Sequence, residues 1–589
     1  MSSNQDICRV FDQMAAGLEI LGANRFRVNA YAKASRVIDD LTDDLRAIVE
    51  EDPPSAVKRL TEFDGIGKGM AEKIAQFVET GSMEEHREML EKVPVGLFDI
   101  LEIPGIGPKA ARAMWDQLGI GSLEELENTS DEALASLPRM GKKTVDNIRQ
   151  AIEFNKRSGG RVQIGLAQPI AIALRDEIAA LEGVTRVEYA GSLRRGRETI
   201  GDLDFLVSCQ DTDLVREAFT GHPWVTQVLA KGETKCSVRL EKGQVIMQAD
   251  LRLVPEEVYG AALMYFTGSK EHNVRLREVA IRQGKHLNEY GLFEGTAERP
   301  QESGAEPLAA IREEEIYREL GLAYIPPEMR EDRGELERAG RGELDLIELR
   351  DVRAELHAHT TASDGRLSID ELAEEARSRG FHTLAVTDHS KSSVIAGGLQ
   401  DDELRRHIAA VREANERIEG ITVLAGSEVD ILTDGSLDYD DDLLAELDVV
   451  VASPHAALRQ DPDTATERLL RAIRHPLVHI LGHPTGRIIN KREGLSPDMA
   501  ALIEAAVECD TALELNANWH RLDLRDSHLR SALAAGCKIA IDTDAHDSPH
   551  FDFLSYGVLT ARRAGMAADS CINTWDADRL RAWLRSKRP

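Results

Sequence analysis

Residues 191–207 read GSLRRGRETIGDLDFLV, which places a Gly-Ser turn, a basic pair and an Asp-x-Asp pair on an apolar background. Alternate side chains of a strand share a face, so Asp202 and Asp204 should point the same way while their apolar neighbours enter a core. Two adjacent carboxylates repel each other unless a cation lies between them, and oxygen-only ligands favour Mg²⁺ or Mn²⁺. The stretch therefore predicts a metal-dependent phosphoryl-transfer site.

A second strand adds a third carboxylate. GQVIMQADLRLV at 243–254 alternates well and puts Asp250 on the polar face with Gln248 and Arg252. One Asp on a strand is usually an edge or solvent residue. Three carboxylates on neighbouring strands are what two metal ions about 4 Å apart would need.

The totals describe a large protein with ordinary composition. At 589 residues the chain should form several domains. Its six cysteines form no CxxC pair and indicate reduced thiols. No apolar run approaches a membrane span, and the first residues lack the features of a signal peptide, so we expect a cytoplasmic protein without membrane contact. A net charge of −31 argues against wholesale coating of nucleic acid but not against a local basic track.

Two glycine turns lead into helices in the N-terminal part, at FDGIGKGMAEKIAQFVETG (63–81) and IPGIGPKAARAMWDQLGI (103–120), with a weaker copy at 137–152. Such turns leave backbone N–H groups free at a helix N-terminus, which suits a phosphate, although a ligand-free capped hairpin looks similar. They resemble helix-hairpin-helix motifs, which hold the DNA backbone without reading sequence. The predicted DNA contacts are Gly65, Gly67, Gly105 and Gly107.

The second half, from about 351, alternates strands and helices as in an α/β barrel. Its apolar strand-like runs end repeatedly in histidines and acids, as in AELHAHTTASDG, TLAVTDHS and IAIDTDAH. A lone histidine is usually structural. Six that follow strands, with carboxylates among them, favour Zn²⁺, Mn²⁺ or Fe²⁺, and barrel-strand C-termini are where catalytic groups belong.

Residues 1 to about 330 resemble a family X DNA polymerase, with GS and RRG at 191–196, GDLD at 201–204, KGETK at 231–235 and YFTGS at 265–269 as matching motifs. The resemblance implies that Asp202, Asp204 and Asp250 hold two catalytic metals, and that Asp250 helps activate the primer 3′-hydroxyl for in-line attack on the α-phosphate. Lys231 and Lys235 would flank the primer and template. The implied nucleotide-binding residues are Gly191, Ser192, Arg195, Tyr265, Phe266, Asn273 and Arg277.

The N-terminal segment also resembles the 5′-phosphate and lyase region of this family. Lys73 falls where lyase members carry their Schiff-base lysine, and Tyr31 also matches as a DNA-binding residue. From spacing alone Lys73 is a solvated surface lysine. Phe26 and Arg27 replace the His-Lys pair of the animal lyase members, which weakens the expectation of lyase activity and leaves 5′-phosphate binding in place.

The second half resembles the polymerase-and-histidinol-phosphatase (PHP) domain through the steps HAH, TDHS, GSE, SPH, GHP and DAH. This resemblance implies a centre of two or three Mn²⁺, Zn²⁺ or Fe ions with Glu428 bridging, at which an activated water attacks a phosphodiester. No ligand position is lost, which argues against a purely structural domain. The implied ligands are His357, His359, Asp364, His389, Glu428, His455, His483, Asp544 and His546.

Together these features predict a multidomain α/β protein. We expect a lyase-like helical domain at 1–85, a fingers-like helix-hairpin-helix domain at 86–160, a nucleotidyltransferase palm at 161–255, a thumb at 256–330, a linker at 331–350 and a distorted (β/α) barrel at 351–589.

The expected function is gap filling in base excision repair, from gapped or primed DNA and dNTPs. Mg²⁺ or Mn²⁺ would serve the polymerase site, and a monovalent cation (K⁺ or Na⁺) the hairpins. The barrel would supply a 3′–5′ exonuclease, with AP-endonuclease or 3′-phosphodiesterase activity as an extension, and the chain would be a monomer. The alternatives are a PHP-type phosphoesterase or nuclease tethered to a DNA-binding module with an idle polymerase site, and a small-molecule phosphoesterase with a DNA tether.

Overall fold

The computed structural model describes residues 4–41, 45–63, 65–101, 106–138, 140–142, 144–145, 148–149, 160–295, 297 and 300–587. Contacts divide the chain into two compact units. The first is Met1–Gly160 with Asp498–Ala500, and the second is Arg161–Pro497 with Ala501–Pro589. Among the described residues, no helix combines the length and apolarity that crossing a membrane would require.

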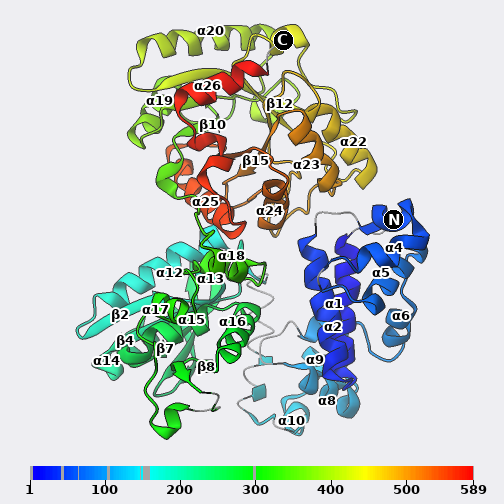
Figure 1. The fold of residues 1–589 in the computed structure, drawn as a ribbon, viewed down its shortest axis with the longest axis vertical. Coiled ribbons are helices and arrows are strands. Elements are labelled where there is room, and N and C mark those ends of the chain that lie inside the picture. Colours follow the sequence, from blue (N-terminus) through cyan, green and yellow to red (C-terminus); the bar gives the residue numbers. More distant parts are fainter. Residues whose placement is uncertain are drawn as a thin grey trace. The chain divides into compact units, whose positions relative to one another are not determined.

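The first unit is helical (Figure 1). Its core gathers apolar side chains from successive helices, with Phe11 packed edge-on against Tyr31 at 5.4 Å between ring centroids. Helix ends follow local chemistry, because the Asn24 side chain caps α2 and left-handed Gly81 and Gly119 end α5 and α8. The helices are α1 (Asn4–Ile20), α2 (Arg25–Asp40), α3 (Leu45–Glu51), α4 (Pro53–Leu60), α5 (Lys68–Thr80), α6 (Glu84–Leu90), α7 (Gly96–Leu101), α8 (Pro108–Leu118), α9 (Leu123–Asn128) and α10 (Asp131–Ala135).

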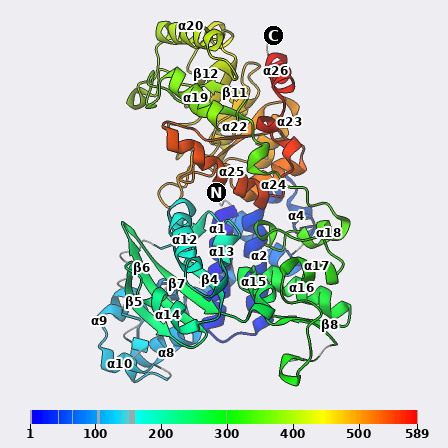
Figure 2. The same cartoon turned by 90° about the vertical axis from the view of Figure 1, so that its left-hand side faces the viewer.

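The second unit begins with a five-stranded sheet of order β2-β4-β7-β6-β5, in which only the β4–β7 pair is parallel. Figure 1 labels β2, and Figure 2 labels the other four strands. Apolar side chains from alternate positions of β4 pack under helices α12 and α14, as the Phe205–Phe219 contact illustrates. The strands are β1 (Val162–Gln163), β2 (Val184–Tyr189), β3 (Thr199–Ile200), β4 (Asp202–Cys209), β5 (Val225–Lys231), β6 (Lys235–Lys242) and β7 (Val245–Leu253). The helices are α12 (Ile164–Ala179), α13 (Gly191–Arg194) and α14 (Thr212–Thr220).

A smaller helical layer follows the sheet. It comprises α15 (Tyr259–Thr267), α16 (Lys270–Arg282), β8 (Lys285–Asn288), β9 (Gly291–Glu294), α17 (Glu313–Glu319) and α18 (Glu335–Arg341). Residues 331–350, which the sequence assigns to a linker, contain α18 and bury Leu336, Ala339 and Ile347. This stretch therefore packs onto the preceding layer instead of forming a bare connection.

The rest of the second unit is a sheet of seven parallel strands in sequence order, β10 to β16. A parallel bridge between Ala358 and Ala545 joins the end of the first strand to the residues after the last, so the barrel is nearly closed. The predicted distorted barrel is confirmed. Its strands are β10 (Ala354–Ala358), β11 (Thr383–Val386), β12 (Thr422–Asp430), β13 (Val449–Ser453), β14 (Ile480–Leu481), β15 (Ala512–Asn516) and β16 (Ile539–Asp542).

Helices surround this barrel, as the upper part of Figure 1 shows. These helices bury aliphatic residues on one face. Capping boxes at Ser368 and Gln400 form the N-termini of α19 and α20. They are α19 (Ile369–Ser378), α20 (Asp401–Arg417), α21 (Asp441–Leu444), α22 (Pro462–Ile473), α23 (Met499–Glu508), α24 (Asp526–Ala534), α25 (Leu554–Arg563) and α26 (Ala577–Ser586).

Candidate polymerase and metal sites

The three aspartates predicted for the first site lie together on the sheet. In the parallel β4–β7 pair Asp204 stands opposite Asp250 and Asp202 stands opposite Gln248. Asp250 is buried, and Gln248 Nε2 donates to its Oδ1 at 2.9 Å. The alternation of the two strands thus brings the three carboxylates together on one face of the sheet.

The electrostatics of this group of three carboxylates favour a bound cation. Burial, then the charges of Asp202 and Asp250, raise the pKa of Asp204 to about 7. Burial and Asp250 also raise the pKa of Asp202. Lys235 Nζ lies 2.5 Å from Asp250 Oδ2, so a lysine supplies part of the positive charge in this conformation. The clustered oxygen donors suit Mg²⁺ or Mn²⁺.

Gly191 lies directly against the carboxylate of Asp204. Its φ is +61°, and a Cβ added there would come 2.6 Å from Asp204 Oδ2. Only glycine meets both conditions without displacing the carboxylate. Ser192 is the next residue and belongs to the short helix α13.

The other predicted nucleotide-binding residues form a linked group. Arg195 Nε donates to Glu331 Oε1 at 3.1 Å, and its Nη1 donates to the Thr267 carbonyl. Asn273 Nδ2 donates to the Tyr265 carbonyl at 2.8 Å. This fixes the end of α15, on which Tyr265 is partly exposed, against the start of α16.

Two further predicted residues complete this region. Phe266 packs edge-on against Tyr265 and lies under the guanidinium of Arg252, 4.2 Å from its ring centroid. Arg277 Nε donates to the Asn273 carbonyl at 3.1 Å.

The two lysines predicted to flank DNA are both paired with acids. Lys235 contacts Asp250, as described above, and Lys231 Nζ lies 2.7 Å from Glu217 Oε1. Lys231 and its partner are exposed, so this contact is easily exchanged for a phosphate.

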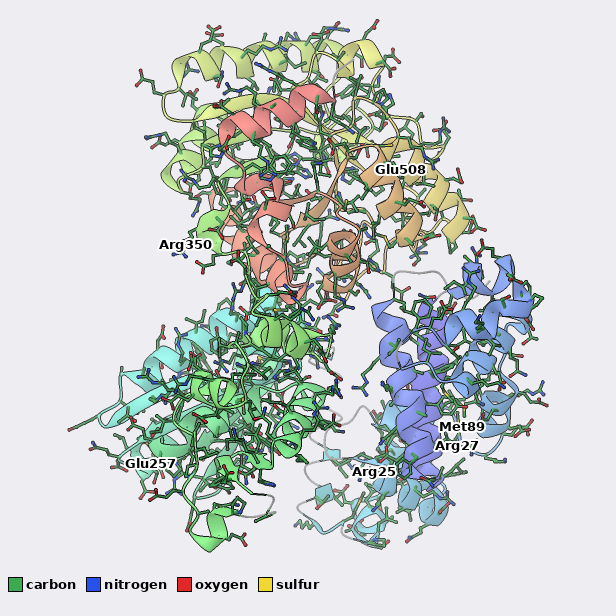
Figure 3. All side chains as sticks on the ribbon, in the orientation of Figure 1. Arg25, Arg27, Met89, Glu257, Arg350 and Glu508 are labelled. Carbon is green, nitrogen blue, oxygen red and sulfur yellow. The ribbon has the colours of Figure 1, made fainter. Side chains whose placement is uncertain are left out.

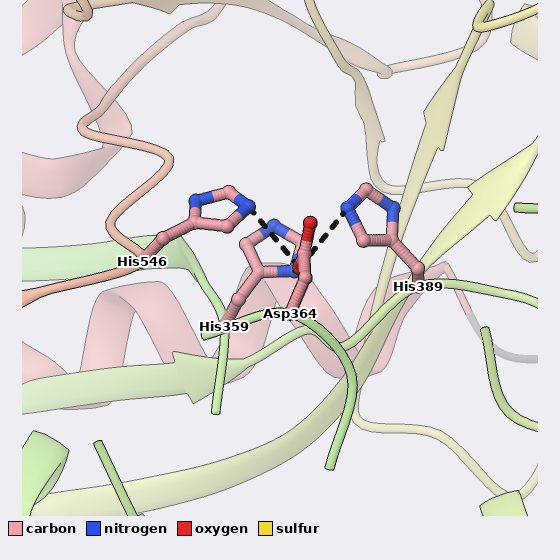
Figure 4. A group of neighbouring side chains, drawn as sticks. All are labelled: His359, Asp364, His389 and His546. Carbon is pink, nitrogen blue, oxygen red and sulfur yellow. Dashed lines mark ion pairs between the residues drawn. The ribbon is translucent and has the colours of Figure 1, made fainter. Parts of the chain in front are cut away.

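The barrel gathers all the predicted ligands at the C-terminal ends of its strands. Each of them belongs to at least one group whose ligand atoms lie within 4.8 Å of one another. Figure 4 shows one group, in which Asp364 pairs with His389 and His546 beside His359. The groups are His359-Asp364-His389-His546, His357-Glu428-His483, His357-His359-Asp544 and His389-Glu428-His455.

Glu428 is a member of two of these groups. Its Oε1 is 3.2 Å from His455 Nε2 and 3.4 Å from His483 Nε2, and its Oε2 is 2.8 Å from His389 Nδ1. Burial raises the pKa of Glu428, but the surrounding histidines, His455 first, lower it well below its usual range. Such a carboxylate can share its two oxygens between neighbouring ions.

The donor atoms at the centre fit metal ions. His357 Nε2, His359 Nε2 and both Glu428 carboxylate oxygens are buried and make no hydrogen bond within the described part of the chain. Buried polar atoms are otherwise nearly always satisfied. Burial, His546 and His389 lower the pKa of His359 to about 4, which favours the neutral imidazole. Burial lowers the pKa of His455, but Glu428 and Asp430 raise it to about 10, so metal binding must displace a proton from that ring. Imidazole with carboxylate suits Mn²⁺, Zn²⁺ or Fe²⁺.

Sequence reasoning missed the residues that orient these histidines. Glu514 on β15 is fully buried and lies 2.6 Å from His357 Nδ1 and 3.2 Å from His483 Nδ1. Asp430 contacts His455 Nδ1 at 2.9 Å. The available signal was an acid inside an otherwise apolar strand, ALELN, and the spacing of two residues between Glu428 and Asp430.

In the helical unit, Lys73, Tyr31 and Arg27 converge on one carboxylate, that of Glu85. Lys73 Nζ is 3.0 Å from Oε2, and the Tyr31 hydroxyl donates to the same oxygen at 2.7 Å. Arg27, labelled in Figure 3, pairs with Oε1.

The predicted glycines of this unit differ in their surroundings. Gly65 has φ +102° and packs against Val37. Gly67 and Gly107 are the N-caps of α5 and α8 and face open space, where a phosphate could approach. Gly105 lies outside the described residues.

Four family models match the chain. They are a helix-hairpin-helix domain at residues 2–83, a SAM-like helix-hairpin-helix tandem at 98–153, the DNA polymerase beta thumb at 262–331 and the PHP domain at 355–518.

Curated relatives match the same regions. A protein named DNA polymerase/3′-5′ exonuclease PolX from Bacillus subtilis (strain 168) is 36% identical over 582 residues, or 99% of each chain. DNA polymerase lambda of Arabidopsis thaliana is 27% identical over 56% of this chain and 62% of its own. A "Probable phosphatase" of Thermoanaerobacter sp. (strain X514) is 29% identical over 39% of this chain and 94% of its own. Because the first similarity spans both units, the chain belongs to the PolX family, the family X DNA polymerases that carry a C-terminal PHP domain.

Proposed function

We propose that this chain extends primers at short gaps in DNA and removes nucleotides from 3′ ends at a second site. The observation that carries the proposal is the presence of two complete and separate constellations, the three aspartates on β4 and β7 and the histidine–carboxylate groups of the barrel. Gap filling from dNTPs in base excision repair and cleavage at abasic or blocked 3′ ends are the finer parts of the proposal.

At the first site the three aspartates would hold Mg²⁺ or Mn²⁺, which neutralise the charge that develops on the phosphates. Asp250, buried beside Gln248, would lie next to the primer 3′-hydroxyl and accept its proton. Arg195 would exchange Glu331 for the triphosphate, beside Gly191 and Ser192. Tyr265 and Phe266 would line the sugar pocket, with Asn273 and Arg277 near the new base pair.

At the second site the nine predicted ligands would hold Mn²⁺, Zn²⁺ or Fe ions, which supply an activated water and stabilise charge. Glu428 divides its oxygens between neighbouring groups, and Glu514 fixes the rings of His357 and His483.

Two substitutions separate the activities. Asp204→Asn should reduce extension of a gapped duplex by about a thousandfold or more and leave 3′ degradation intact, and His357→Ala should do the reverse. Extension by Asp204→Asn at the wild-type rate would refute the polymerase site. Unchanged degradation by His357→Ala would place the nuclease elsewhere.

The similarity to a probable phosphatase supports a second candidate, a phosphoesterase acting on small molecules. Assays of the wild-type chain with a gapped duplex and with phosphate monoesters distinguish the two. A preference for monoesters, with no release of nucleotides from DNA, would favour the phosphoesterase.

Lys73 is the candidate nucleophile for a 5′-deoxyribose-phosphate lyase reaction. Its contact with Glu85, which also accepts a hydrogen bond from Tyr31, supports a role in binding the 5′-phosphate. Borohydride trapping on an incised abasic duplex tests the nucleophile. A covalent adduct that Lys73→Ala abolishes would establish it, and equal adduct in both proteins would exclude it.

A further inference from the structure

The loop after His389 presents two bare aliphatic side chains to solvent. It contains the short turn η5 (Val394–Ala396), in which Ile395 is 106% exposed and Val394 is 78% exposed relative to an extended reference chain. A residue of this type normally gains stability from burial. Two neighbouring aliphatic side chains that are both exposed next to a functional site indicate a surface that binds another molecule.

The loop conformation is fixed at its base. The Ser392 backbone N and Oγ both donate to the Asp438 carboxylate at 2.6 Å, and Ser393 Oγ donates to Asp430 Oδ2 at 2.7 Å. Gly398 packs so closely on Ser390 that a Cβ would come 1.9 Å from its carbonyl oxygen. The exposed tip therefore belongs to a defined structure.

Both ends of the loop are anchored beside predicted metal ligands. Asp430, which receives the Ser393 hydrogen bond, also contacts His455 Nδ1. The position of Gly397 faces Ser363, the neighbour of Asp364. The tip is thus continuous with the rim of the metal centre.

The same rim carries a cation. The Arg366 side chain is 78% exposed, and its backbone N donates to the His546 carbonyl at 2.8 Å. Its pairing with Asp547 is exposed to solvent and easily exchanged. A cation for phosphates and an apolar tip for bases, on two segments that are both anchored beside metal ligands, match the chemistry that recognises a nucleic acid strand.

We propose that Val394 and Ile395 form an apolar wedge that enters between the terminal bases of a DNA strand and frees its 3′ nucleotide for the metal centre. Aliphatic side chains of this kind insert between base steps in other DNA-binding proteins. The inference rests on the proposed 3′–5′ degradation. The wedge is a positioning device, because it acts on bases and not on the reacting phosphate.

The test compares the double variant Val394→Ser/Ile395→Ser with the wild type on three substrates. These are a duplex with a paired 3′ end, the same duplex with a mismatched 3′ end, and the small ester bis(p-nitrophenyl) phosphate. We expect kcat/KM on the paired end to fall about tenfold or more, because the variant no longer helps to open the terminal base step. The mismatched end should change within about twofold, and the ester should not change.

Two further variants sharpen the result. Leu349→Ser, at the half-exposed first residue of η4 (Leu349–Asp351), removes an aliphatic side chain distant in sequence from the loop and should leave all three rates unchanged. Val394→Leu/Ile395→Leu keeps the apolar tip and should retain the wild-type kcat/KM on the paired end.

The wedge is overturned if the double variant leaves the paired-end rate unchanged or lowers paired and mismatched ends equally. A parallel loss on the small ester also overturns it, because the metal centre would then be the part affected. A wild-type chain that hydrolyses the ester but releases nothing from any DNA would instead remove the proposed function, and the wedge with it.

Discussion

Lys73 and Glu85 form an ion pair in which Nζ lies 3.0 Å from Oε2. Tyr31 and Arg27 donate to the same carboxylate, so three donors surround one anion. A phosphate offers more oxygens and more charge to the same donors than a carboxylate does. Glu85 therefore competes for the place that a 5′-phosphate would take.

Glu85→Gln should tighten binding of gapped DNA with a 5′-phosphate about fivefold, because the donors no longer pair with an acid. Fluorescence anisotropy with 5′-phosphate and 5′-hydroxyl gaps measures the effect. The matched control is Glu84→Gln, an exposed acid on the same helix α6. Equal tightening of the 5′-hydroxyl gap would show a general charge effect and contradict a phosphate site.

Glu514→Gln should weaken metal binding in the barrel about 10- to 100-fold, because the carboxylate fixes the rings of His357 and His483. Titration of 3′ degradation with Mn²⁺ should show the loss as a higher half-saturating concentration, while primer extension stays at the wild-type rate. Glu508→Gln, an exposed acid on α23 that Figure 3 labels, serves as the control. An unchanged Mn²⁺ requirement would exclude the positioning role.

Sequence patterns predicted the site residues whose positions depend on local periodicity. Alternation in IGDLDFLVS and QADLRLV already placed Asp202, Asp204 and Asp250 on polar strand faces, and β4 and β7 prove to be neighbours with Asp204 opposite Asp250. The barrel ligands followed from acids and histidines at the ends of apolar runs. These signals span only a few residues, so the sequence carries them directly.

Contacts between distant segments could not be predicted. Glu514 lies 157 residues from His357 in the chain, and nothing near either residue indicates that they meet. The Lys235–Asp250 contact depends on the pairing of β6 with β7. The burial of residues 331–350 was also hidden, because an acidic segment reads as solvated until its partner surface is known.

Gly191→Ala should lower the rate of primer extension about a hundredfold or more and leave the rate of 3′ degradation unchanged. An added Cβ would lie 2.6 Å from Asp204 Oδ2, so the carboxylate must move. Gly243→Ala separates this contact from backbone strain, because Gly243 has a similar φ of +63° with nothing within 4 Å of the added carbon. Single-turnover extension assays give the rates. Comparable losses in both variants would mean that strain alone explains the effect.

Glu331 should make the second unit sensitive to acid. Burial raises the pKa of Glu331, but Arg563 and then Arg195 lower it to about 2, so the carboxylate is more acidic in the folded chain than its ordinary value of 4.5. A lowered pKa stabilises the fold at every pH above about 4.5, and this contribution is lost as the pH falls toward 2. Calorimetry between pH 7 and 3 should show the loss as a falling transition temperature.

Glu331→Gln tests this assignment, because it leaves Arg563, which is 3% exposed, with Asp526 as its remaining carboxylate partner. The variant should unfold with about 3 kcal/mol less free energy at pH 7, and its transition temperature should depend less on pH than that of the wild type. Glu257→Gln, at an exposed position of η1 (Glu256–Val258), should leave both quantities unchanged. If Glu331→Gln retained the full wild-type pH dependence, other carboxylates, such as Glu313 between Arg194 and Arg330, would carry the acid sensitivity instead.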